Sequence, residues 1–155
     1  MKLREAVVIA LSSTVLAGMP VAQAKDAAPA GKAVLMPAGD IKWTDVKEFP
    51  GVKMAVLHGD PAKGAHHSML RLPAGFNAPV HHHTADHYVT VVSGTVVFTI
   101  DGKDTKLPAG SWFAFTGKKA HITKCEAGAD CVLSNDARAK WDVIAHDAKA
   151  PPAKK

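Results

Sequence analysis

The stretch from Gly75 to Gly94, GFNAPVHHHTADHYVTVVSG, contains the residues best suited to chemistry. On an extended strand the side chains at positions i and i+2 share a face, so His81 and His83 point the same way and His82 points oppositely. Two imidazoles on one strand face offer two nitrogen ligands to a transition metal. The spacing therefore predicts half of a metal site.

Two further histidines are placed to complete that site. After a short turn the chain re-enters a strand at His87, whose i+2 neighbours Val89 and Val91 are typical of a core, so His87 is expected on the inward face. His121 follows the turn at Gly117 and is expected to arrive from a distant strand. The predicted metal ligands are therefore His81, His83, His87 and His121.

The other histidines are interpreted differently. His82 is expected to be exposed or to lie behind the ligands. Surface positions are expected for His58, His66, His67 and His146. The alternative for the whole histidine run is a solvated polar loop without a resident metal, and a bulge of one residue would turn His87 outward.

The elements that must position these residues are short and β-rich. Turn signals with Gly or Pro separate short runs of β-branched and aromatic residues, and no long run has apolar residues at helical spacing. This pattern predicts an all-β fold, an antiparallel sandwich or barrel. Ser93-Gly94, between two Val-rich runs, predicts a tight hairpin. The expected strands are 52–57, 68–72, 88–92, 95–100, 111–115 and 131–133.

The histidine spacing resembles the first sequence motif of the cupins, G-x5-H-x-H-x3-(ligand)-x6-G, with its glycines at Gly75 and Gly94. The second cupin motif, G-x5-P-x-G-x2-H, is matched at Gly110 and His121, but Thr116 and Lys118 stand where it has Pro and the second Gly. The resemblance covers roughly residues 50–145. It implies a single-domain cupin, a jelly-roll β-barrel with a metal in its mouth, similar to the small exported single-domain cupins.

Cupins usually carry Glu at the position of His87. The replacement makes an all-nitrogen ligand set, similar to that of the four-histidine cupins, and it removes the most obvious general base. Asp86 and Tyr88 fall on the opposite strand face and do not replace that base. The expected cofactor is one divalent transition metal ion (Fe, Cu, Ni, Zn or Mn) rather than Mg²⁺ or Ca²⁺.

Two functions fit a cupin with such a site. The first is a metalloenzyme, of the dioxygenase, isomerase or lyase type, acting on a small organic substrate. The second is a non-catalytic periplasmic module that binds or senses metal, with its ligand positions saturated. The resemblance also implies a homodimer. Candidate pocket residues are Phe76, Trp112, Phe113 and Phe115, although aromatic residues in such strands are more often plain core.

The N-terminus has the three parts of a secretory signal peptide: basic Lys2 and Arg4, a short apolar stretch, and an A-x-A site that ends at Ala24. The expected organisation is a signal peptide over 1–24, cleaved after Ala24, a flexible linker over 25–32, the cupin domain over 33–146 and a disordered tail over 147–155. The mature protein is expected in the periplasm or secreted, without a membrane attachment.

Composition and cysteine usage agree with a small exported domain. The chain has 155 residues, 47% of them hydrophobic and 21% charged, which excludes collagens, coiled coils and disordered proteins. The formal net charge of +5 is spread over scattered lysines, with no basic stripe for nucleic acid. In an oxidising compartment Cys125 and Cys131 are expected to form a structural disulfide; a thiolate metal site or a redox pair is the alternative.

Overall fold

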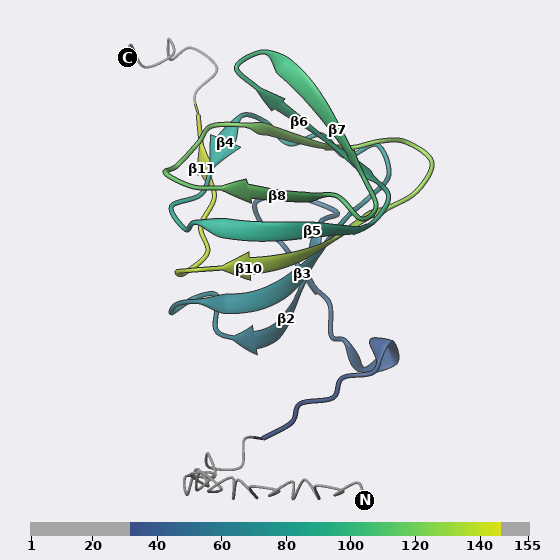
Figure 1. The fold of residues 1–155 in the computed structure, drawn as a ribbon, viewed down its shortest axis with the longest axis vertical. Helices are drawn as coiled ribbons and strands as arrows, with labels where there is room; N and C mark the ends of the chain where they lie inside the picture. The colour runs from purple at the N-terminus through teal and green to yellow at the C-terminus, as the bar shows by residue number, and fades with distance from the viewer. Residues whose placement is uncertain (1–31, 147–155) are drawn as a thin grey trace, which may run out of the picture. The chain divides into compact units, whose positions relative to one another are not determined.

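Short strands joined by glycine-containing turns make up most of the structure, a computed structural model that describes residues 32–146 (Figure 1). The expected signal peptide, the linker up to residue 31 and the tail lie outside the described residues. The elements are η1 (Ala38–Asp40), β1 (Thr44–Asp45), β2 (Lys53–Gly59), β3 (His66–Leu72), β4 (His81–His82), β5 (His87–Ser93), β6 (Thr95–Ile100), β7 (Lys103–Pro108), β8 (Trp112–Phe115), β9 (Ile122–Cys125), β10 (Cys131–Ala137) and β11 (Ile144–Ala145).

The strands form three antiparallel sheets. The largest has the order β1-β2-β3-β10-β5-β8, and the others are β7-β6-β9 and β11-β4. Figure 1 shows the strands of the largest sheet side by side, with β6 and β7 set apart from them. Inward residues of both larger sheets, such as Val89, Val91, Val96 and Phe98, pack into one core. Within residues 32–146 the hydrogen-bonded ladders do not close into a continuous barrel, but the predicted all-β fold is confirmed.

The expected strands correspond to β2, β3, β5, β6, β8 and β10, with ends moved by at most a few residues. The sequence pattern missed β7, whose residues KDTKLP are nearly all exposed. As the edge of its sheet, β7 pairs only on one side and carries lysines, which discourage further pairing. Among the described residues there is no helix with the length and apolar character that crossing a membrane requires.

The predicted hairpin at Ser93-Gly94 is wrong. β5 and β6 flank these residues but belong to different sheets, so the chain crosses from one sheet to the other there. Gly94 has φ 76°, and a Cβ on it would lie 2.8 Å from the Asp130 carbonyl oxygen and 2.9 Å from Cys131 Cα. Glycine is therefore required at this crossing by backbone conformation and by close approach of the chain.

The tight hairpin of the smaller sheet lies at Asp101-Gly102 instead. Ile100 of β6 pairs with Lys103 of β7 across a two-residue loop. Asp101 and Gly102 have φ values of 50° and 77°, the positive angles that a type I′ turn needs at both central positions. The Asp-Gly sequence thus fixes the register of the edge strand β7.

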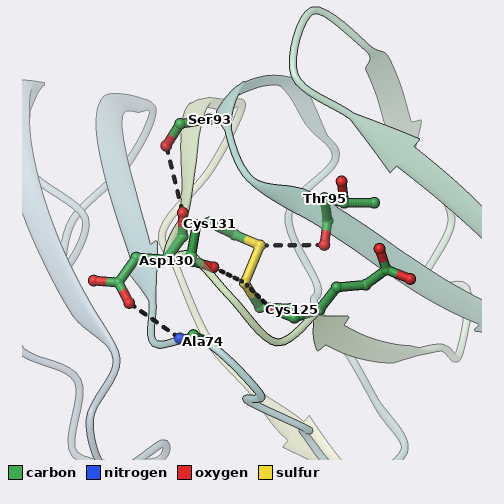
Figure 2. The surroundings of a disulfide bond; sticks show 8 residues. Ala74, Ser93, Thr95, Cys125, Asp130 and Cys131 are labelled. Atoms are coloured by element: carbon green, nitrogen blue, oxygen red, sulfur yellow. Dashed lines mark hydrogen bonds between the residues drawn. A yellow bond between two sulfur atoms is a disulfide. The ribbon is translucent and has the colours of Figure 1, made fainter.

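The predicted disulfide between Cys125 and Cys131 is present, with a Cα–Cα distance of 5.8 Å (Figure 2). Cys125 ends β9 and Cys131 begins β10, so the bond ties the two larger sheets together at the end where the chain crosses between them. Beside it, the Asp130 carboxylate accepts a hydrogen bond of 3.0 Å from the Ala74 backbone N–H. Both sulfur-bearing residues are buried in the core cluster.

Reduction of this disulfide is expected to lower the melting temperature. Closing a loop of this length stabilises the native state by about 2 kcal/mol in the chain-entropy model, which corresponds to roughly 5–10 °C for a domain of about this size. Thermal unfolding with and without a phosphine reductant measures the shift. A double variant with Cys125→Ala and Cys131→Ala is the control, because its melting temperature must not respond to reductant. An equal melting temperature of reduced and oxidised wild type would contradict the expectation.

Candidate metal centre

Three histidines from two separated stretches of the chain converge in the structure. His81 lies in β4, His83 follows that strand, and His121 precedes β9; all three are buried. One ligand nitrogen of each lies within 4.8 Å of the others. The backbones of His81 and His121 exchange two hydrogen bonds, of 3.0 and 2.9 Å, which brings their rings to 4.4 Å between centroids. A backbone ladder therefore sets the spacing of these two imidazoles.

His87 lies next to this group, although the group of three does not include it. It is the first residue of β5, is buried, and has its ring centroid 4.9 Å from that of His83. The inward direction expected from strand parity is thus observed. Asp86 is exposed on the other face, where its carboxylate accepts a hydrogen bond from the Gly117 N–H. Ligation by His87 stays a prediction.

The four predicted ligand histidines share one hydrogen-bonding arrangement. Each donates from Nδ1 to a backbone carbonyl, at 2.6–3.0 Å, and a carbonyl oxygen only accepts, so Nδ1 carries the proton and Nε2 keeps its lone pair. Such a bond to Nδ1 fixes the tautomer and the ring orientation in metal sites. The pairs are His81 with Pro79, His83 with Asp142, His87 with Ala85, and His121 with Lys119.

Burial keeps these imidazoles neutral. Desolvation lowers the pKa of His83 to about 3 and that of His121 to about 4, and it also lowers the pKa values of His81 and His87. Backbone hydrogen bonds act in the opposite direction but are weaker. At neutral pH all four are therefore unprotonated at Nε2, the form that binds a metal. The donor set fits a first-row transition metal and not a hard, oxygen-seeking cation.

Aromatic side chains pack against the imidazole rings. Phe115 stacks on His121 at 4.0 Å between centroids, and Trp141 stacks on His83 at 4.1 Å. Trp141 also meets His87 edge to face at 5.2 Å. Its own backbone N–H donates to the Pro61 carbonyl at 2.8 Å, which anchors the loop after β10. These contacts restrict rotation of the imidazole rings.

A cavity between the two larger sheets opens beside the histidines. Its volume is about 60 Å³. The four predicted ligand histidines line it, together with Thr123 and Asn135. Phe76, Phe113 and Phe115 lie in its wall, as the sequence suggested. The aromatic residues that sequence reasoning missed there are Phe49, Phe98 and Trp141.

Trp112 does not line the cavity, so the prediction that it is a pocket residue is wrong. Its side chain is 61% exposed and stacks on Tyr88 on the outer face of the sheet. Side chains alternate along β8, so the inward positions of Phe113 and Phe115 send Trp112 outward. Because Trp112, Phe113 and Phe115 are all aromatic, the sequence pattern did not separate the outward position from the inward ones.

The predicted surface position of His66 is also wrong, because its side chain is only 4% exposed. It begins β3 on the inward face, and its Nδ1 donates to the Gly64 carbonyl at 3.0 Å. His58 and His67 are exposed as expected. His82 is half-buried, points away from the buried group and lies 2.7 Å from His146, Nδ1 to Nε2.

The turn that delivers His121 has a left-handed backbone conformation at two successive residues. Lys118, at the position where the motif has Gly, has φ 59°, in the left-handed region. Gly117 beside it has φ 66°. A lysine in this region costs roughly 1 kcal/mol more than glycine would. The turn before His121 adopts this conformation despite that cost.

The two packed antiparallel sheets, with buried histidines and a cavity between them, have the fold of the cupins. The polyketide cyclase RemF from Streptomyces resistomycificus has a similar fold, with a TM-score of 0.66 and 16% identity over 78% of this chain and 90% of that chain. An RmlC-like cupin from Ralstonia eutropha has a TM-score of 0.61 and 23% identity over 77% of this chain and 76% of that one. A predicted oxalate decarboxylase from Thermotoga maritima has a TM-score of 0.58 and 20% identity over 68% and 99%.

The chain belongs to the family described as "Domain of unknown function (DUF4437)", whose model matches residues 19–138. No curated protein matches the sequence significantly. Because the solved structures are less than 25% identical, their likeness establishes the fold and leaves the chemistry to be argued from the site.

Proposed function

We propose that this cupin is a transition-metal-dependent enzyme that acts on a small organic substrate. The observation that carries the proposal is the position of the histidines, which line a cavity between the two larger sheets instead of being enclosed in the core. Catalytic metal sites keep a position open to substrate, while structural sites are closed by protein ligands. The same fold is found in the polyketide cyclase RemF and in a predicted oxalate decarboxylase.

In this proposal His81, His83 and His121 bind the metal through Nε2, with His87 as the fourth ligand. A metal held there supplies Lewis acidity to a substrate oxygen. The chain's own contribution is to fix four neutral imidazoles through their Nδ1 hydrogen bonds and to surround the substrate with apolar rings. Among residues 32–146 no aspartate or glutamate lines the cavity. The proposal therefore does not include proton transfer by a carboxylate base. It favours dioxygenase, isomerase or lyase chemistry on a substrate whose own hydroxyl group is acidic.

We also propose export to the periplasm. The pattern of Lys2, Arg4 and the A-x-A site supports it, and so does the disulfide, because disulfides persist in oxidising compartments.

The test is the metal content and the coordination of untagged protein folded in the periplasm. Elemental analysis is expected to find close to one first-row transition metal per chain. The metal is then replaced by Co²⁺, and azide is added while the visible spectrum is followed. An open position predicts a saturable spectral change.

A Co²⁺ spectrum that does not respond to azide would overturn the enzyme and support a non-catalytic metal-binding or sensing module. His146→Ala is a matched control, since this exposed histidine lies outside the cavity. The variant should bind one Co²⁺ and respond to azide as the wild type does.

A further inference from the structure

One polar group in the cavity wall has no role in the metal site. Asn135, in the middle of β10, is fully buried with 0% exposure and lines the cavity. Its Nδ2 donates to Ser68 Oγ at 3.3 Å, while its Oδ1 has no hydrogen-bond partner among residues 32–146. A buried acceptor without a partner is costly, and native proteins rarely keep one without a reason. A ligand that donates to Oδ1 supplies that reason.

Sheet register places Asn135 close to the histidines. On one side it pairs with Val89, the inward residue after His87 on β5, and on the other with Ser68 of β3. Two residues that lie on the same face of a strand, at positions i and i+2, are about 7 Å apart. A molecule anchored at the histidine group thus needs only the length of a small ring to reach the amide. Ser68, also fully buried, holds the amide from the far side.

The rest of the wall limits the charge of that molecule. Six aromatic side chains and several aliphatic ones surround the space, and within the described residues no lysine, arginine, aspartate or glutamate lines it. An ionised group placed away from the metal would lose its hydration without gaining a partner. The cavity therefore fits a ligand with one acidic oxygen, an apolar body and a neutral polar end. A dicarboxylate does not fit.

We propose, on the basis of the function proposed above, that Asn135 is a substrate-binding residue and that the substrates are compact hydroxylated aromatic or enolic rings. One ring oxygen would bind at the metal as an oxyanion after its hydroxyl proton is released to solvent. A second hydroxyl, on the same ring, donates a hydrogen bond to Asn135 Oδ1. The apolar wall contacts the ring between these two oxygens.

Two phenols of similar size test the proposal on the Co²⁺-loaded full chain. Resorcinol carries a second hydroxyl, whereas 3-methoxyphenol has the same ring and first hydroxyl but no second donor. Wild type is expected to bind resorcinol about fivefold to tenfold more tightly, as followed in the Co²⁺ visible spectrum. That ratio is what one buried hydrogen bond contributes. Asn135→Leu, which keeps the volume and removes the acceptor, is expected to bind Co²⁺ normally and to lose the preference.

Equal binding of the two phenols by wild type would overturn the role of Asn135, and this comparison stands even if Asn135→Leu fails to fold. Unchanged discrimination in a folded Asn135→Leu variant would overturn it as well. Failure of a Co²⁺-loaded chain to bind either phenol would overturn the substrate class while leaving the metal site intact. A chain that takes up no Co²⁺ would instead overturn the proposed function on which this inference rests.

Discussion

Alanine at His81, His83 or His121 is expected to weaken Zn²⁺ binding by at least about 100-fold, because each change removes one of the three nitrogens that converge in the site. Loss of a residue that only supports a metal ligand already lowers metal affinity 10–100-fold in other proteins. Loss of a ligand itself is expected to lower the affinity at least as much. Competition with a chromophoric chelator measures the affinity on untagged protein.

His82→Ala is the matched control for these variants. It lies on the same short strand as His81 but points away from the buried group toward His146. Its Zn²⁺ affinity should stay within about twofold of wild type. His87→Ala tests whether the metal has three or four histidine ligands. A decrease in Zn²⁺ affinity similar to that of His83→Ala supports ligation by His87. Unchanged affinity in the His81 and His83 variants, with the fold intact by circular dichroism, would refute the site.

Strand periodicity explains why most of the site was predictable. The i, i+2 rule placed His81, His83 and His87 on one face without any knowledge of the fold, and all three are buried. His121 needed the motif spacing, because it lies far along the chain from the others and reaches them through backbone pairing with His81. Lys118, which stands where the motif has glycine, lies in the left-handed region that favours glycine.

The parts that sequence reasoning missed depend on contacts between distant segments. Trp141 stacks on His83 only because the loop after β10 folds back over the site, and no periodic pattern surrounds it. Gly94 looked like a hairpin glycine, but its need for space comes from Cys131, which is far away in sequence. His66 is a polar residue at a strand start, and only its pairing with Ala137 on β10 shows that it is inward.

Acid is expected to destabilise the metal-free protein steeply. The pKa of His83 falls from an ordinary 6.5 to about 3 on folding, and that of His121 falls to about 4, both through burial. The unfolded chain therefore binds more protons than the folded one, and stability falls as the pH drops from about 6.5 toward these folded values. At pH 4.5 the loss from His83 alone is roughly 2–3 kcal/mol relative to pH 7.5.

Urea unfolding of chelator-treated protein at pH 7.5, 6.0 and 4.5 measures this slope. His83→Gln removes one of the buried groups that must protonate, so its stability should vary less with pH than that of wild type. His67→Gln is the control at an exposed histidine and should leave the slope unchanged. One equivalent of Zn²⁺ should stabilise the wild type more at pH 7.5 than at pH 4.5, because protons and metal compete for Nε2. A metal-free chain equally stable at all three pH values would mean that these imidazoles are hydrated and charge freely, which would contradict the lowering of their pKa values by burial.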